Sequence, residues 1–285
     1  MRAVSDLSFD VQPGRVTGFL GPNGAGKSTT LRMLLGLIRP TGGDATIDGL
    51  HYDKLEEPTA RVGAMLEDTS FHPGRSGRDH LRVLATAGDH PMQRVDELID
   101  LVELRGAETR RVGGYSQGMR QRLALASSMI GDPRILILDE PTNGLDPGGI
   151  RWLRGLMRQM AAEGRTVLVS SHLLAEVAQA VDDVVVIAKG ELRARGSLEE
   201  VLGGGEAPVT DVRTPYPDHL LASLERRGHS AQRASDHDLI VPGATPEQVG
   251  IAAAEDGLTL YRLAPRTRSL EDTFLELTGD EVNPS

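Results

Sequence analysis

The stretch "GPNGAGKST", residues 21–29, decides how the larger part of this chain folds. It fits the phosphate-binding pattern G-x-x-x-x-G-K-[ST]. The apolar run 16–20 before it predicts a short buried strand, and the sequence from Lys27 onward predicts a helix. A strand, this loop and a helix form the structural context in which the pattern binds phosphate. The fixed positions of the pattern are Gly21, Gly26, Lys27 and Ser28.

The residue types of this loop explain how it would hold a nucleotide. Glycines let backbone N–H groups turn toward phosphate oxygens at close range. Lys27 is expected to reach the β- and γ-phosphates, and Ser28 offers a hydroxyl to magnesium. An ordinary glycine-rich turn is the alternative, but lysine is too rare in this sequence to make a chance match common. The expected nucleotide contacts are Gly21, Pro22, Asn23, Gly24, Ala25, Gly26, Lys27, Ser28 and Thr29.

A second stretch, "ILILDEP" at residues 135–141, predicts the other half of the site. Its four apolar residues predict a buried strand, and Asp139 and Glu140 emerge at the carboxyl end of that strand. Ligands of parallel sheets bind at this end. Asp139 is therefore expected to hold magnesium, and Glu140 to polarise the attacking water. Two acids that end a strand by chance are the alternative.

Composition narrows the class of protein. The 285 residues allow one large or two modest domains, and the net charge of -10 argues against a nucleic-acid partner. The absence of cysteine excludes disulfides and thiolate metal sites and fits a reducing cytoplasm. The longest apolar runs are far shorter than the ~18 residues of a membrane span. Any membrane part is therefore expected on another chain.

The pattern of apolar residues predicts an α/β fold with a helical insertion. Between residues 76 and 132 the sequence shows only amphipathic helix patterns. This block interrupts an otherwise alternating order of strands and helices, which predicts a parallel sheet. The five predicted strands are 16–20, 61–66, 134–139, 166–171 and 182–188.

A glycine-rich break at residues 203–208 predicts a linker between a first domain, 1–202, and a second, 209–285. Residues 209–263 read as strand, helix, strand, strand, helix, strand, which predicts a small ferredoxin-like α+β domain. The chain then shows a helix that starts at Ser269 and stops at Gly279.

The stretch "GGYSQGMRQR", residues 113–122, predicts the start of another helix. Ser116 can cap it, and two arginines lie in its first turns, which suits an anion. An ordinary capped helix is the alternative, and Met119 is equally consistent with core packing. No catalytic residue type lies beside this stretch in the sequence.

Over residues 1 to about 202 the sequence resembles the ATP-binding cassette ATPases of membrane transporters, because the motifs occur in the order of that family. Residues 21–29 resemble the Walker A loop and 135–141 resemble Walker B with its catalytic glutamate. The stretch 115–122 resembles the family signature, with Tyr115, Gln117 and Met119 at positions of different consensus residues. Residues 144–147, "GLDP", resemble the D-loop, and His172 matches the switch histidine.

The resemblance implies a P-loop cassette with a helical subdomain that binds ATP and Mg²⁺. Two cassettes of this family pair head to tail, so Ser116 and Gly118 are expected to contact the γ-phosphate held by a second copy. His172 is expected to hold Glu140 and the γ-phosphate, although a lone histidine after a strand is commonly structural. The further nucleotide contacts that the resemblance implies are Gln117, Met119 and Asp146.

The sequence departs from the family at two places. Glu67 stands where the family has a glutamine that contacts magnesium, so Glu67 is the third expected metal ligand. The aromatic residue on which the family stacks adenine is missing, and Phe9 reads as an apolar strand residue. The natural protein is therefore expected to start upstream of Met1, or the chain to hold the base loosely and to discriminate poorly between ATP and GTP.

Within the family, the chain is most similar to single-cassette exporter ATPases of the daunorubicin and antibiotic-resistance type. This resemblance implies that the chain forms a homodimer and works with a separate permease. It also implies a drug, antibiotic or lipid-like substrate and a peripheral position on the inner face of the cell membrane. Two alternatives remain: a cassette ATPase of translation or DNA repair, and a regulatory protein that binds ATP without turnover.

Overall fold

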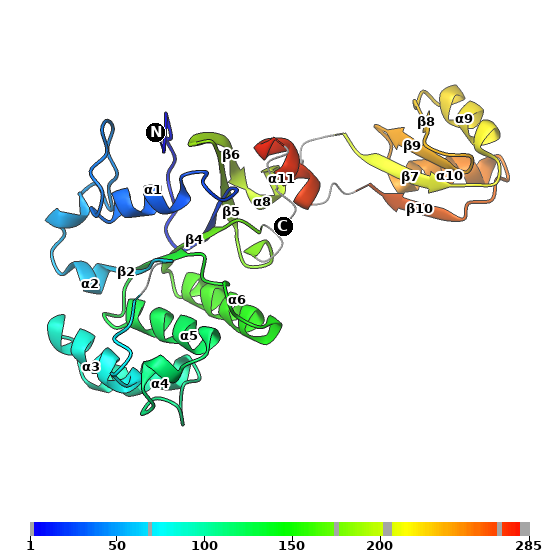
Figure 1. Ribbon diagram of the computed structural model, residues 1–285. Coiled ribbons are helices and arrows are strands. Elements are labelled where there is room, and N and C mark those ends of the chain that lie inside the picture. Colours follow the sequence, from blue (N-terminus) through cyan, green and yellow to red (C-terminus); the bar gives the residue numbers. More distant parts are fainter. Residues whose placement is uncertain (1–2, 68–69, 174–176, 202–206, 267–269, 280–285) are drawn as a thin grey trace. The chain divides into compact units, whose positions relative to one another are not determined.

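The structure of the chain is a computed structural model that describes residues 3–67, 70–173, 177–201, 207–266 and 270–279. The chain divides into two compact units. The first comprises Met1–Val201 and Thr273–Ser285, and the second comprises Leu202–Asp272. Figure 1 labels most of the helices and strands of both units.

The first unit is built on a six-stranded sheet with the order β2-β3-β4-β1-β5-β6. The five strands predicted from the sequence are confirmed, and they pair in parallel. The sixth strand, β6, was not predicted; it pairs antiparallel with β5 and is only partly buried. The strands are β1 (Val16–Leu20), β2 (Val62–Met65), β3 (Ile135–Asp139), β4 (Thr166–Ser171), β5 (Asp183–Ala188) and β6 (Glu191–Ser197).

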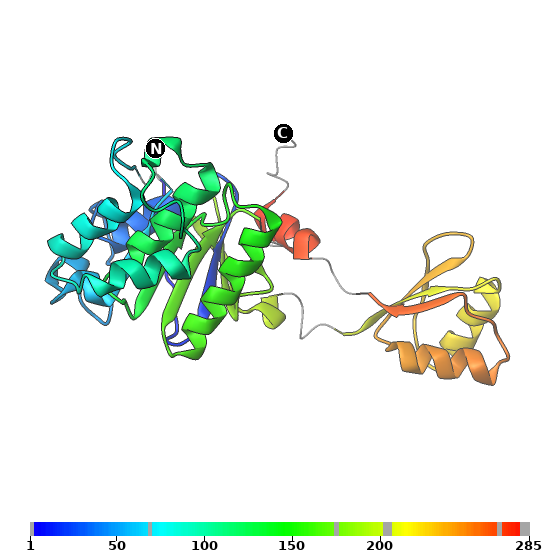
Figure 2. The same ribbon diagram turned by 90° about the horizontal axis from the view of Figure 1, so that it is seen from below.

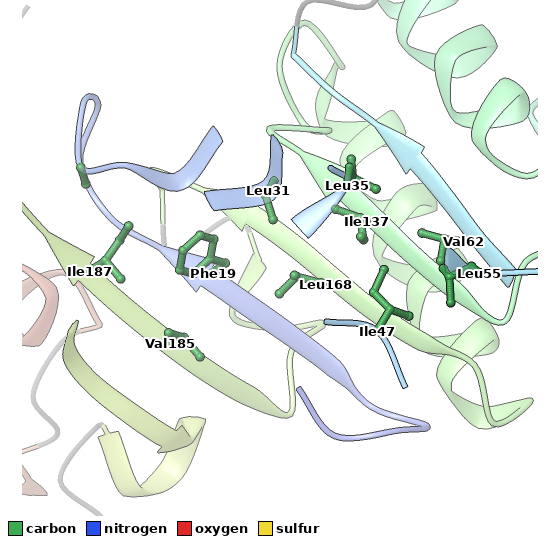
Figure 3. Packing of buried hydrophobic residues seen from close by; sticks show 11 residues of the cluster. Phe19, Leu31, Leu35, Ile47, Leu55, Val62, Ile137, Leu168, Val185 and Ile187 are labelled. Carbon is green, nitrogen blue, oxygen red and sulfur yellow. The ribbon is translucent and has the colours of Figure 1, made fainter. Parts of the chain in front are cut away.

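Helices cover both faces of this sheet, which is why its central strands β1 and β4 are almost wholly buried. Helix α1 (Lys27–Leu34) lies on one face, and α6 (Pro147–Ala162) lies on the other (Figures 1 and 2). In Figure 3 the side chains of Phe19, Ile137 and Leu168 lie along the face that also packs against Leu31 of α1. Fully burying one such side chain contributes about 1.5–3 kcal/mol.

Phe9 joins this core but lies outside any strand. Its ring stacks on that of Phe19, with the centroids 5.2 Å apart and the planes at 28°. The expectation of an apolar core residue is therefore met, whereas the expected strand is not formed, because residues 7–12 run past the sheet without pairing to it. The side chain is half-buried and packs against the core cluster of the sheet.

The predicted helical insertion is confirmed. Residues 76–132 contain three α-helices joined by loops, and the structure forms no strand within that span. Ser76 caps the first of them by accepting a hydrogen bond from the backbone N–H of Asp79, 3.1 Å away. The helices of the insertion are α3 (Gly77–Ala87), α4 (Gln93–Leu101) and α5 (Gln117–Ser128), with a 3₁₀ turn, η2 (Val112–Gly114). Elsewhere in the first unit lie η1 (Tyr52–Lys54), α2 (Pro58–Arg61) and α8 (Leu198–Val201).

The second unit has the strand–helix–strand–strand–helix–strand order that the sequence predicts. Its antiparallel sheet has the order β10-β7-β9-β8, which is the ferredoxin-like arrangement. Its core is formed by the inward face of the sheet and by its two helices, including Val212, Leu220 and Leu239. The elements are β7 (Val209–Arg213), α9 (Pro217–Arg226), β8 (Gln232–Arg233), β9 (Asp238–Pro242), α10 (Pro246–Glu255) and β10 (Arg262–Pro265).

Most of the last helix, α11 (Leu270–Thr278), does not belong to the second domain as expected. From Thr273 onward its residues group with the first unit, so the second unit ends at Asp272 and not at residue 285. The helix ends as predicted at Gly279, whose φ of 65° is left-handed. The predicted cap Ser269 and most of the predicted linker 203–208 lie outside the described residues. No helix in the described ranges is long and apolar enough to cross a membrane.

Candidate functional site: a phosphate loop facing a buried acid

The loop between β1 and α1 adopts the conformation that its glycines permit. Gly24 and Gly26 have φ values of 78° and 105°, which side-chain-bearing residues rarely adopt. A Cβ atom added to Gly21 would lie 2.4 Å from the carbonyl oxygen of Ile187. Helix α1 begins at Lys27 directly after this loop, so free backbone N–H groups gather where the motif expects phosphate. Ser28 lies in the same first turn and is half-buried.

Lys27 joins this loop to the end of β3. Its Nζ donates to the carbonyl oxygens of Gly21 and Pro22, at 2.7 and 3.3 Å. The same atom lies 3.2 Å from Oε1 of Glu140, and both side chains are 6% exposed. The two halves of the site predicted from separate stretches of sequence are thus brought together.

The two acids at the end of β3 are held by a residue of the neighbouring strand. Ser170 on β4 accepts a hydrogen bond from the backbone N–H of Glu140, 3.0 Å away, and donates its own proton to Oδ1 of Asp139. Ser170 was not among the site residues expected from the sequence. The only signal was its place beside the predicted histidine in "SSH".

Asp139 has a free oxygen suited to a cation. Its side chain is 1% exposed, and its Oδ2 is buried without a hydrogen-bond partner among the described residues. Buried polar atoms normally have a hydrogen-bond partner, an ordered water or an ion beside them. Carboxylate oxygens are among the ligands that Mg²⁺ prefers. The donor set therefore fits the magnesium role expected of Asp139.

His172 contacts the second oxygen of Glu140. Its Nδ1 lies 2.8 Å from Oε2 of Glu140, and its side chain is 30% exposed. An ionised carboxylate only accepts hydrogen bonds, so toward it Nδ1 is the donor, and Nε2 makes no hydrogen bond to the residues that the structure describes. Lys27 and His172 thus approach the two oxygens of one carboxylate.

The expected signature residues begin helix α5. Ser116 caps it, because its Oγ accepts from the backbone N–H of Met119 at 3.2 Å. Ser116 and Gln117 are exposed, whereas Gly118 and Met119 are half-buried. Among the described residues, no hydrogen bond or ion pair joins these four to the phosphate loop of the same chain.

Tyr115 replaces the usual first residue of the signature and links α5 to α3. Its hydroxyl donates to the carbonyl oxygen of Ala107 at 2.8 Å, and burial raises the pKa of this phenol. A Cβ atom on Gly77 would lie 2.4 Å from the same hydroxyl, so the start of α3 needs a glycine there. This departure from the consensus is accommodated by packing within the helical insertion.

The positions of Asp146 and Glu67 do not by themselves support their expected roles at the site. The Oδ1 of Asp146 accepts from the backbone N–H of Gly149 at 2.8 Å and so caps α6. Glu67 is exposed in the turn that follows β2. Within the described ranges, no cluster of three or more acidic or histidine side chains could hold a metal ion. The nucleotide role of Asp146 and the metal role of Glu67 therefore remain predictions.

A glycine-bearing phosphate loop after β1, a lysine at the start of the following helix and a buried acid pair at the end of β3, the next strand but one of the same parallel sheet, define a P-loop nucleotide-binding ATPase. Comparisons with known proteins agree. A family model described as "ABC transporter" matches residues 4–143, and one described as "Domain of unknown function (DUF8746)" matches residues 208–271.

Two curated relatives match over almost the whole chain. An uncharacterized ABC transporter ATP-binding protein of Bacillus subtilis, YdbJ, is 36% identical over 96% of this chain and 90% of its own length. The bacitracin transport ATP-binding protein BcrA of Bacillus licheniformis is 35% identical over 98% of this chain and 93% of its own length. A solved ATP-binding subunit of an ABC transporter matches with a TM-score of 0.64 and 28% identity, over 70% of this chain and 85% of that one. The chain belongs to the ABC transporter ATP-binding proteins, which bind and hydrolyse ATP.

Proposed function

We propose that this chain hydrolyses ATP to power the export of a drug-like, antibiotic or lipid-like compound through a separate permease. The observation that carries the proposal is the placement of Glu140, whose two carboxylate oxygens lie beside Lys27 and His172. The exporter role is supported by the similarity to a bacitracin transport protein. As part of a transporter, the chain would lie at the inner face of the cell membrane.

Each residue of the site has a different role in hydrolysis. Lys27 and the backbone N–H groups of the loop hold the β- and γ-phosphates. Glu140 accepts the proton of a water molecule as its oxygen attacks the γ-phosphorus, and the bond to the β-phosphate oxygen breaks to give ADP and inorganic phosphate. His172 fixes the carboxylate through its Nδ1 and offers Nε2 to the γ-phosphate.

Magnesium would be held by Ser28 and Asp139, with Glu67 as a third ligand. When bound, the ion neutralises charge on the phosphate oxygens. The unpaired buried oxygen of Asp139 supports this assignment. Ser170 contributes by holding Asp139 through its other oxygen, which leaves Oδ2 for the ion.

The complete site needs a second copy of the chain. Ser116 and Gly118 start an α-helix whose free N–H groups suit an anion, yet they make no hydrogen bond to their own phosphate loop among the described residues. We infer that they contact the γ-phosphate bound by a second cassette in a head-to-tail homodimer. Gln117, Met119 and Asp146 would line the same interface.

Glu140→Gln tests this proposal. The amide keeps the size of the side chain but cannot accept the proton, so we expect hydrolysis to fall by at least ~10²-fold while ATP binding persists. With ATP, light scattering should then detect an accumulated dimer. Glu225→Gln, an exposed change on α9, is the matched control and should behave as wild type. A Glu140→Gln variant that releases phosphate at the wild-type rate removes Glu140 from the mechanism.

A further inference from the structure

Helix α5 is attached to the segment that follows Glu140 at two points one turn apart. Gln117 and Gln121 both lie on the side of α5 that faces residues 140–144. Residues four apart share one face of a helix, so the two glutamines act from the same side. The expected signature and the catalytic segment are therefore in direct contact within one chain.

Gln121 makes the stronger of the two connections. Its Nε2 donates to the carbonyl oxygens of Glu140 and Pro141, at 3.2 and 3.1 Å. Both partners are acceptors, and only the nitrogen of the amide group can donate, so the network fixes the orientation of the side chain. The carbonyl oxygen of Glu140 also accepts from the backbone N–H of Asn143 at 3.2 Å.

The backbone that Gln121 contacts has an unfavourable conformation. Glu140 has a φ of 50°, in the left-handed region that residues with a side chain seldom adopt. Such a conformation persists where surrounding contacts hold it, and it is common at functional sites. At Glu140 the N–H is held by Ser170 and the C=O by Gln121 and Asn143.

Gln117 adds a steric contact to the same segment. Gly144 has a φ of 77°, and a Cβ atom there would lie 2.4 Å from the side-chain carbons of Gln117. The glutamine thus fills the space that a side chain at Gly144 would need. Any shift of α5 along its axis would move both glutamines against residues 140–144.

We propose that Gln121 is a positioning residue for Glu140, and that it transmits the position of the signature helix α5 to the catalytic carboxylate. When contact with a second copy places the N-terminus of α5, Gln121 places the carbonyl of Glu140, and the left-handed backbone aims the carboxylate at the attacking water. The inference rests on the proposed role of Glu140 and on the proposed head-to-tail dimer. It gives each cassette a way to sense its partner through its own helix.

Two substitutions of similar size separate the hydrogen bond from simple packing. Gln121→Met keeps the volume and loses the donor, and Gln121→Glu keeps the shape but has only acceptors that face two carbonyl oxygens. For both we expect kcat for ATP hydrolysis to fall by about 10- to 100-fold, the scale for a misplaced reacting group. The KM for ATP should stay within about twofold, because no hydrogen bond joins Gln121 to the phosphate loop among the described residues.

The controls fix the meaning of each result. Ser127→Ala removes a hydroxyl that donates within α5, to the carbonyl oxygen of Leu123 at 2.7 Å, and should keep the wild-type kcat. Adding Gln121→Met to Glu140→Gln should lower the residual rate no further, because residues that act as a unit are not additive. Thermal unfolding midpoints of all variants show that they fold.

Three outcomes overturn an assignment. If Gln121→Met hydrolyses ATP at the wild-type rate while Glu140→Gln does not, Gln121 does not position Glu140. If kcat falls only together with a rise in KM and a lower unfolding midpoint, Gln121 is a packing residue. If Glu140→Gln itself is fully active, the proposed function of Glu140 fails, whatever Gln121 does.

Discussion

The ammonium group of Lys27 lies 3.2 Å from Oε1 of Glu140, and both side chains are 6% exposed. One lysine therefore belongs both to the phosphate loop and to the environment of the candidate base. Removing one partner of a buried ion pair leaves the other charge without compensation, which is costly. A change at either residue of this pair is therefore expected to lower the unfolding free energy of the chain as well as its activity.

Lys27→Ala tests both roles of the lysine. Losing a charge-assisted contact to phosphate should weaken ATP binding by about 10- to 100-fold, measured with a fluorescent nucleotide. The variant should also lose unfolding free energy, on the order of a few kcal/mol, because the buried carboxylate of Glu140 loses its lysine partner and keeps only the contact with His172. Adding Glu140→Gln should restore part of that loss. Strict additivity of the two changes in urea unfolding would show that the pair does not interact.

Glu67 is expected to act only while magnesium is bound. A carboxylate is a strong ligand for this ion, yet it repels the γ-phosphate, so its effect should appear in the magnesium dependence of hydrolysis. Glu67→Gln should keep basal hydrolysis, whereas Glu67→Ala should need more magnesium for half-maximal rate and should weaken coupling to the permease. If Ala leaves the magnesium titration and transport unchanged, Glu67 is a surface acid only.

Gly63 on β2 should tolerate no side chain. A Cβ atom there would lie 1.9 Å from the backbone carbonyl oxygen of Ser128, which ends α5. Gly63→Ala should therefore lower the unfolding free energy by about 1–3 kcal/mol or more. Gly155 on α6 is the matched control, because a Cβ atom there meets nothing within 4 Å. Gly155→Ala should stabilise by about 0.5–1 kcal/mol in the same thermal unfolding assay, and equal effects of the two changes would contradict the packing described here.

Asp256 should make the second unit sensitive to acid. The Ser223 hydroxyl and the guanidinium group of Arg227 lower the pKa of this carboxyl from its ordinary 3.8 to about 2. A folded pKa below the unfolded one contributes stability above pH 3.8, and this contribution is lost as the pH falls toward 2. Asp256→Asn should therefore be less stable than wild type at neutral pH, with a difference that shrinks between pH 4 and 2. If Asp256→Asn and wild type differ in unfolding free energy by the same amount at pH 7 and at pH 2, the carboxyl group of Asp256 does not contribute this stability.

The sequence alone determined most of the architecture of this chain. The strands of the parallel sheet, the helical insertion at 76–132 and the order of elements in the second unit follow from the period of apolar residues, which is a local property. The phosphate loop could also be predicted from the sequence, because its function needs glycines and a lysine at fixed spacing. The antiparallel strand β6 escaped prediction because its half-exposed residues lack the continuous apolar run of its neighbours.

Tertiary structure decided how the site is assembled. Lys27, Glu140 and His172 come from three segments far apart in the sequence, and only the parallel pairing of β1, β4 and β3 gathers them. Neither Ser170 nor Gln121, although Gln121 lies within the signature-like stretch 115–122, was expected to act at the site. A hydroxyl or an amide becomes a positioning group only when a particular backbone atom lies within hydrogen-bond distance. Local pattern fixes which residues form strands and helices, whereas contacts between distant segments depend on packing that no local pattern encodes.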